Sequence, residues 1–264
     1  MGLAREGGWK IIEQAGPNPL HDIVVIGAST GGVSALQAIT ISFPADLRAS
    51  VFIVLHVPPE APSFLPAILA RAGSLSVKHA EDGEAIEYGR IYVAPPDYHL
   101  LLKHGCMLLG RGPEENHYRP AIDPLFRSAA RAYGPRVVGV VLTGYRSSDG
   151  TAGLQAVKSQ GGLAIVQDPE EAASSEMPAN ALRYVDIDYC LPLADIGPIL
   201  ARLSLGSSNY SRNGRNQFPR RRARKPDALK IPARRAYPGL AKSASSPFPF
   251  RLPSPPGEGR IRRI

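Results

Sequence analysis

The chain has 264 residues and a formal net charge of +8, which is long enough for one or two domains with a buried core. Two isolated cysteines, the lack of any zinc-type Cys/His spacing and the lack of an apolar run of ~18 residues argue against a disulfide framework, a zinc site and a membrane span. Because the first 20 residues also lack the continuous apolar stretch of a signal peptide, we expect a soluble cytoplasmic protein.

From residue 21 the chain alternates short β-branched runs with longer amphipathic runs, after an N-terminal linker over 1–20. Strands are predicted at 23–26, 51–56, 90–94, 137–143, 163–167 and 187–191, and helices at 32–41, 63–72, 122–133, 151–160, 178–184 and 193–203. The order predicts one α/β domain over 21–203, with a doubly wound, mostly parallel sheet and helices on both faces. Residues 99–110 are predicted to form a small antiparallel excursion with Gly105 in its turn.

The positive charge is concentrated at the end of the chain. Residues 204–264 hold 15 Lys or Arg against 2 Asp or Glu, whereas residues 1–203 hold 16 against 21. The composition of 204–264, rich in Arg, Pro and Ser, predicts a basic disordered tail. A solvated tail without a partner is the simpler interpretation, and a salt-sensitive contact with nucleic acid is the alternative.

Three polar residues follow predicted strands. Ser29 lies in "IGASTGG" after the first strand, His56 ends the second, and Asp149 comes shortly after the strand 137–143. In a doubly wound sheet, binding and chemistry collect at the carboxyl ends of the strands. These side chains are therefore candidates for a common site.

The glycine-rich stretch around Ser29 allows three interpretations. A dinucleotide loop needs G-x-G-x-x-G and an acid about twenty residues on, and the chain has neither. An α/β-hydrolase matches G-x-S-x-G, but it needs a histidine late in the chain, and none lies in the last 147 residues. A serine hydrolase with the order Ser, His, Asp remains.

Such a hydrolase needs a hydroxyl, an imidazole that takes and returns its proton, and a carboxylate that orients the imidazole. Spacing alone does not separate this role from simpler ones, because a serine at a helix start is more often an N-cap. Likewise, a histidine that ends a strand is often only hydrogen-bonded in place. His99, Asp97 and Asp123 also follow strands or begin a helix; we expect packing for His99, a turn for Asp97 and a helix start for Asp123.

The stretches "IGASTGG", "LHVPP" and "LTG…DG", in this order, resemble the catalytic domain of the CheB family of chemotaxis protein-glutamate methylesterases. Three further stretches support the resemblance: "EDGEAIEYGRIYVAPPDYHLLL", "NHYRPAIDPLF" and "GGLAIVQDPEEAASSEMPANAL". The similarity runs from about residue 23 to residue 203, so it is more specific than any single motif.

The resemblance implies that Ser29 is the nucleophile, His56 the general base and Asp149 the orienting carboxylate. It places Thr30 after the nucleophile, where its backbone N–H serves the oxyanion and its hydroxyl helps to position the imidazole. Gly31 lets the substrate approach closely, and Tyr145 falls at a position that lends a second N–H.

The implied reaction is hydrolysis of glutamate γ-methyl esters, together with deamidation of glutamine, on the cytoplasmic helices of methyl-accepting chemoreceptors. It requires no metal or organic cofactor. A receptor methyltransferase is a second implied partner.

Two departures from the family pattern stand out. Only about 20 residues precede the first strand, so we expect no receiver domain there. The loop from Thr143 to Gly150 is one residue longer than the family's T-G-M-G-x-D-G and lacks its second glycine. We expect Arg146 and Ser147 to form an exposed bulge. The lengthened loop keeps an alternative open: a catalytically degenerate scaffold member of the same family.

Overall fold

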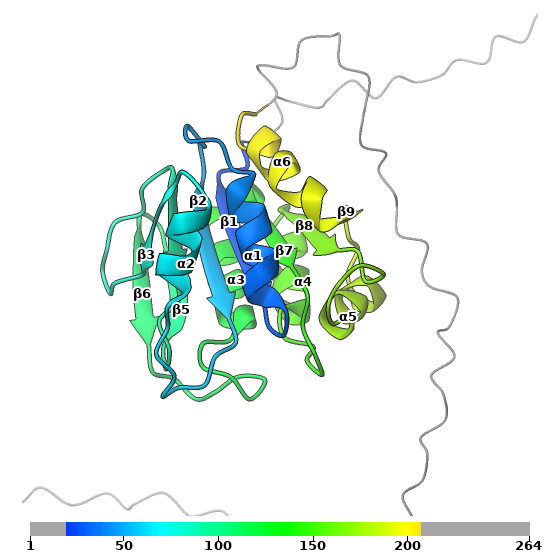
Figure 1. Ribbon diagram of the computed structural model, residues 1–264, viewed down its shortest axis with the longest axis horizontal. Coiled ribbons are helices and arrows are strands. Elements are labelled where there is room, and N and C mark those ends of the chain that lie inside the picture. The colour runs from blue at the N-terminus through cyan, green and yellow to red at the C-terminus, as the bar shows by residue number, and fades with distance from the viewer. Residues whose placement is uncertain (1–19, 207–264) are drawn as a thin grey trace, which may run out of the picture. The chain divides into compact units, whose positions relative to one another are not determined.

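The computed structural model describes residues 20–206 and contains a seven-stranded, entirely parallel sheet (Figure 1). Its order is β3-β4-β2-β1-β7-β8-β9. The strands are β1 (Ile23–Ala28), β2 (Ser50–Leu55), β3 (Ser76–His79), β4 (Arg90–Val93), β7 (Val137–Val141), β8 (Leu163–Gln167) and β9 (Tyr189–Leu191). Apart from residue 20 and residues 204–206, the predicted linker 1–20 and tail 204–264 lie outside the described residues.

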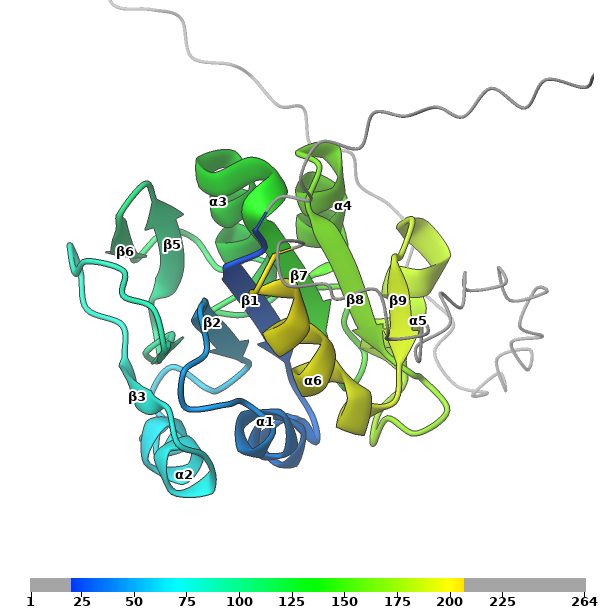
Figure 2. The same cartoon turned by 90° about the horizontal axis from the view of Figure 1, so that it is seen from above.

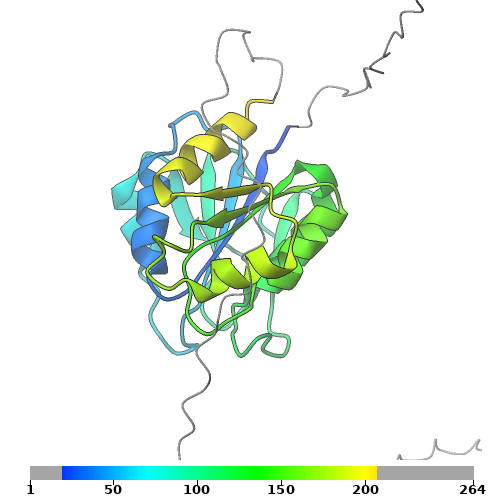
Figure 3. The same ribbon diagram turned by 90° about the vertical axis from the view of Figure 1, so that its right-hand side faces the viewer.

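Helices cover both faces of the sheet, as Figures 2 and 3 show from two directions. One face carries α1 (Gly32–Ile41), α2 (Leu65–Ala72) and α6 (Leu193–Leu203); the other carries α3 (Ile122–Tyr133), α4 (Thr151–Ser159) and α5 (Glu176–Tyr184). The alternation within β1 explains this arrangement, because Ile23 and Val25 pack into one core and Val24 and Ile26 into the other. The predicted doubly wound α/β fold is confirmed.

The antiparallel excursion is also confirmed. It is a hairpin of β5 (His99–Lys103) and β6 (Cys106–Gly110), with Gly105 at φ 85° in the turn. The hairpin packs against α3, and a short 3-10 helix, Gly134–Arg136, leads from α3 into β7.

Some boundaries were predicted wrongly. β3 was not predicted; it is a four-residue edge strand whose side chains are all at least partly exposed, so it lacks a buried apolar run. Helix α2 begins at Leu65 rather than at residue 63, with a proline in its first turn. β9 begins at Tyr189, two residues after the predicted start.

The chain order places a topological switch point beside β1. From β1 the chain moves through α1 to β2 on one side, and from β7 it moves through α4 to β8 on the other. A crevice at the carboxyl ends of β1 and β7 is the usual binding position in such a sheet.

The two ends of the described part lie together. The His21 N–H donates to the Leu203 carbonyl at 3.4 Å, so the start of β1 meets the end of α6. A methyl group added at Gly206 would lie 3.5 Å from the Leu20 side chain. Within residues 20–206, no helix combines the length and apolar character needed to cross a bilayer.

Candidate active site

Ser29, His56 and Asp149 are brought to the carboxyl end of the sheet by three neighbouring strands. Ser29 follows β1 directly and its N–H donates to the Thr143 carbonyl at 3.0 Å, which ties it to the segment after β7. His56 follows β2, and its N–H donates to the Ala28 carbonyl at 3.1 Å. Asp149 lies in the turn before α4. Residues up to 120 positions apart in the chain thus share one edge.

His56 and Asp149 form a buried pair. Nε2 of His56 lies 2.8 Å from Oδ2 of Asp149, and the two side chains are 1% and 0% exposed. Because the carboxylate accepts a hydrogen bond at Nε2, this nitrogen carries the proton in the neutral ring. Nδ1 is then the basic nitrogen; it is buried and has no hydrogen-bond partner among residues 20–206.

Asp149 is held by a converging set of donors. Its carboxylate accepts from the N–H groups of Ile122 at 2.7 Å and Asp123 at 3.0 Å, and from Nδ2 of Asn116 at 2.8 Å. The two backbone donors belong to the N-terminus of α3, where the helix dipole favours an anion. Burial acts to raise the pKa of Asp149, but the hydrogen bonds from His56 and Ile122 outweigh it and hold that pKa below its ordinary value.

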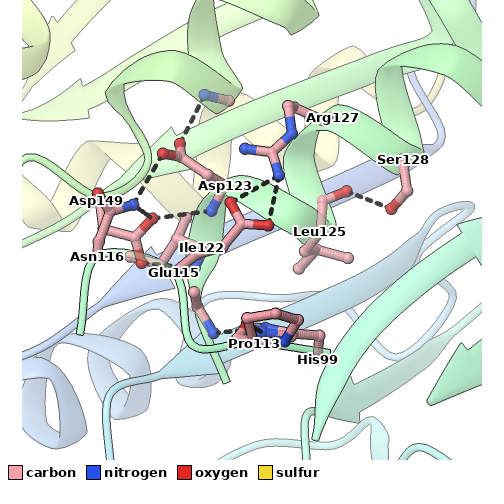
Figure 4. A network of polar contacts seen from close by, with 12 residues as sticks. His99, Pro113, Glu115, Asn116, Ile122, Asp123, Leu125, Arg127, Ser128 and Asp149 are labelled. Atoms are coloured by element: carbon pink, nitrogen blue, oxygen red, sulfur yellow. Dashed lines mark hydrogen bonds and ion pairs between the residues drawn. The ribbon is translucent and has the colours of Figure 1, made fainter. Parts of the chain in front are cut away.

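A second buried carboxylate, Asp123, stands beside Asp149 (Figure 4). Asp123 accepts from the N–H groups of Gly153 at 2.6 Å and Gly150 at 2.9 Å, at the start of α4. The amide of Asn116 donates to both carboxylates, with a distance of 3.0 Å to Asp123. Burial and the charge of Asp149 raise the pKa of Asp123 to about 6.

This raised pKa predicts a pH-dependent stability. A carboxyl whose pKa is higher in the folded state stabilises the fold most below its ordinary value near 3.8, and this contribution is lost as the pH rises through about 6. We therefore expect the melting temperature of Asp123→Asn, relative to that of wild type, to rise as the pH increases from 4 to 7. Thermal unfolding followed by circular dichroism at each pH measures this difference, and a constant difference across the range would contradict the assignment.

The site opens into a pocket of about 300 Å³. Ser29 and His56 both line it. Its other lining residues are Val57, Pro58, Pro59, Glu114, His117, Tyr118 and Arg119. A pocket of this size has room for an extended side chain of a substrate.

The backbone after Ser29 is arranged around glycine. Gly31 has φ 79°, and a Cβ there would lie 2.6 Å from the Ala173 Cβ, so another residue would be both strained and crowded. Helix α1 begins at Gly32. The Thr30 N–H donates no backbone hydrogen bond in the described part of the chain. The Thr30 side chain is exposed and makes no hydrogen bond with His56.

The loop from Thr143 to Gly150 has one non-glycine residue with positive φ. Arg146 is exposed with φ 49°, and its guanidinium lies over the ring of Tyr145, 5.4 Å from the ring centroid. Tyr145 is 48% exposed. The prediction that Ser147 is exposed is wrong: Ser147 is 7% exposed, and its Oγ accepts the Asp149 N–H at 3.1 Å. Nδ2 of Asn180 donates to the Ser147 carbonyl at 3.0 Å, so this polar residue is buried with its partners.

His99 and Asp97 have other partners. Nε2 of His99 donates to the Pro113 carbonyl at 2.9 Å, and Nδ1 accepts the Ala121 N–H at 3.3 Å. Asp97 has φ 64° and pairs with Arg111 and Arg119. Neither residue contacts the His56–Asp149 pair. Asp123 is the second residue of α3, and its buried contacts with Asn116 and α4 were not anticipated.

The sequence interpretation missed two residues of the segment 115–118. Asn116 bridges the two carboxylates, and the ring of Tyr118 stacks on the imidazole of His56 with a centroid distance of 3.6 Å and an interplanar angle of 8°. "NHYRP" belongs to one of the stretches that resemble the family, which draws attention to Asn116. No pattern in the sequence indicates the stacking of Tyr118.

The chain is similar to known proteins of one family. The family model described as "CheB methylesterase" matches residues 24–200. A protein of Leptospira interrogans is 38% identical over 184 residues, which cover 69% of this chain and 95% of that protein. Proteins of Methanosarcina mazei and Pyrococcus horikoshii, both named protein-glutamate methylesterase/protein-glutamine glutaminase, are 38% identical over 182 residues. The chain spans about half the length of these two relatives, 49% in each case.

A solved structure shares the fold. The crystal structure of the Thermotoga maritima CheB methylesterase catalytic domain superposes with a TM-score of 0.67 at 37% sequence identity. The match covers 69% of this chain and 98% of that one. The similarity therefore extends over the whole catalytic domain of that protein.

Proposed function

Since the chain belongs to the CheB methylesterase family, whose curated members are named as enzymes, we propose that Ser29, His56 and Asp149 act as its catalytic triad. The observation that carries the proposal is the buried His56–Asp149 pair, which leaves Nδ1 as the basic nitrogen of a residue that lines the same pocket as Ser29. The domain that carries this activity is proposed to span 21–203.

The proposed reaction has two stages. Nδ1 of His56 takes the proton of the Ser29 hydroxyl as Oγ attacks the γ-carbonyl carbon of a methylated glutamate. The tetrahedral intermediate expels methanol, which receives the proton from His56, and a glutamyl ester remains on Ser29. Water, deprotonated by His56, then attacks this ester and releases the glutamate carboxylate and the free hydroxyl. With glutamine as substrate, ammonia leaves in place of methanol.

Charge develops at two atoms in this reaction, and the site provides for both. The oxyanion lies next to the free N–H of Thr30 at the start of α1, with the Tyr145 N–H as a second donor. Gly31 supports the close approach of the substrate. The imidazolium is stabilised by Asp149, whose lowered pKa keeps it ionised at neutral pH.

The substrates in this proposal are the cytoplasmic helices of methyl-accepting chemoreceptors, and a receptor methyltransferase is a partner in the same pathway. The protein would accordingly act in the cytoplasm. A pocket of about 300 Å³ has room for a glutamyl ester side chain that projects from a helical surface.

Methanol release from a methylated receptor fragment tests the proposal. The wild-type protein is expected to release one methanol for each glutamate formed, and a serine-directed organophosphorus reagent is expected to label Ser29, as peptide mass spectrometry can determine. If Ser29 is labelled but no methylated receptor helix yields methanol, the proposed substrate is wrong. If Ser29 is not labelled and no methanol appears, the scaffold alternative takes its place.

A further inference from the structure

The short turn that carries Tyr118 has a specific backbone. The N–H of Glu115 donates to the Tyr118 carbonyl at 3.2 Å, and the N–H of Tyr118 donates to the Glu115 carbonyl at 2.9 Å. The two residues between them, Asn116 and His117, both have positive φ, 53° and 70°. Two-residue hairpin loops with positive φ at both positions are normally made with glycine. Two consecutive non-glycine residues with positive φ are uncommon, and such backbone conformations cluster at functional sites.

The turn is fixed to the domain on both sides. The carboxylate of Glu115 accepts two hydrogen bonds from Nη2 of Arg127 on α3, at 2.8 and 2.7 Å. Arg119 donates to the Gly112 carbonyl at 2.7 Å and to Asp97 at 2.8 Å. Figure 4 shows Glu115 with Arg127, and Asn116 beside Asp149 and Asp123. The turn is therefore a rigid support.

Two side chains of this turn reach the His56–Asp149 pair from different directions. Nδ2 of Asn116 donates to Oδ1 of Asp149, and the ring of Tyr118 covers a face of His56. The imidazole is thus held at its edge by Asp149 and on its face by Tyr118, while Nδ1 stays free of protein hydrogen bonds within the described residues.

The stacking geometry favours one charge state of the ring. Two neutral aromatic rings prefer offset or edge-to-face arrangements to a near-parallel overlap. Here the centroids lie only 3.6 Å apart at 8°. A cation, by contrast, is attracted to the negative face of an aromatic ring, and more strongly where water is excluded. The contact therefore suits the imidazolium that forms while His56 holds the proton of Ser29.

We propose that Tyr118 is a positioning residue that fixes the plane of His56 and stabilises its protonated form during proton transfer. This inference rests on the proposed role of His56 as general base. Because the contact is strongest when the ring is charged, it acts on the transition state more than on substrate binding, and so on kcat more than on KM. The aromatic face of Tyr118 carries the effect, and the hydroxyl does not.

The experiment compares Tyr118→Phe and Tyr118→Leu with wild type. Tyr118→Leu is expected to lower kcat for methanol release about tenfold with KM changed less than twofold, whereas Tyr118→Phe stays within about twofold of wild type. The matched control is Tyr184→Leu. Tyr184 is an exposed tyrosine on α5, and the guanidinium of Arg183 lies over its ring. This control is expected to leave kcat unchanged.

A second readout does not depend on the receptor substrate. Labelling of Ser29 by the organophosphorus reagent requires His56 as a base. Tyr118→Leu is therefore expected to lower the labelling rate about tenfold as well. Unchanged labelling in Tyr118→Leu overturns the inference, whether or not methanol is released. A rise in KM at constant kcat, or an equal loss in Tyr118→Phe, also overturns it, because Tyr118 would then act through substrate contact or through its hydroxyl.

Discussion

Replacement of Ser29 by alanine is expected to lower kcat for methanol release by about 10³-fold or more, because no other group in the pocket replaces the attacking oxygen. His56→Ala is expected to cost about as much, since the serine hydroxyl is a poor nucleophile without its base. The double variant should be little worse than either single one, because the residues act as one unit.

The control for this series is Ser34→Ala. Ser34 lies exposed on α1, less than two turns from Ser29, and is expected to keep wild-type activity. Circular dichroism verifies that each variant is folded. Retention of more than about a tenth of the activity in Ser29→Ala would refute the nucleophile, and additive losses in the double variant would show that Ser29 and His56 act in separate steps.

Asp149→Asn is expected to lower kcat by about 10²–10⁴-fold. The carboxylate accepts from His56, Asn116 and the N-terminus of α3, whereas an amide offers one accepting oxygen and one NH₂ group. Both carboxylate oxygens of Asp149 accept hydrogen bonds, so in either orientation of the amide its NH₂ group faces another donor. If it faces His56, the imidazole changes tautomer and Nδ1 is no longer basic.

The stability of Asp149→Asn should fall as well, because a buried donor loses its acceptor. Asp46→Asn is the matched control, since Asp46 is exposed and lies outside the triad. Steady-state kinetics and melting temperatures measured together separate the two effects. An Asp149→Asn variant as stable and active as Asp46→Asn would show that Asp149 does not orient His56.

The order of elements could be predicted because the sheet is covered on both faces. Strands such as β1, β2 and β7 are fully buried and therefore read as uninterrupted apolar runs. The edge strand β3 has no such run, because within residues 20–206 no strand pairs with its outer side. Its existence depends on pairing with β4, which is information that the local sequence does not contain.

The positions of Ser29 and His56 follow from the same regularity, since each comes directly after a central strand. Asp149 was harder to select from the sequence, because Asp123 and Asp97 were also near strand ends or helix starts. The family resemblance selects Asp149, and the three-dimensional contacts separate the three carboxylates: Asp149 meets His56, Asp123 bridges to α4, and Asp97 meets two arginines.

The burial of Ser147 and the stacking of Tyr118 could not be predicted. Ser147 is buried because Asn180, 33 residues further along, donates to its carbonyl. Tyr118 reaches His56 because Asn116 and His117 adopt positive φ. Neither residue is a glycine, so the sequence does not indicate this turn. Both features depend on pairs of residues distant in sequence or on an uncommon backbone, and local composition indicates neither.

The contact between the start of β1 and the end of α6 affects how the domain can be joined to other chains. Because the His21 N–H meets the Leu203 carbonyl, the two ends of the described part lie together, opposite the carboxyl edge that holds the triad. A domain with adjacent ends can be inserted into a surface loop of a host protein with short connections. For the same reason a short Gly/Ser linker could join residues 20 and 206. New chain ends could then be placed at the exposed tip of the β5–β6 hairpin around Gly105, which would cut no strand of the main sheet.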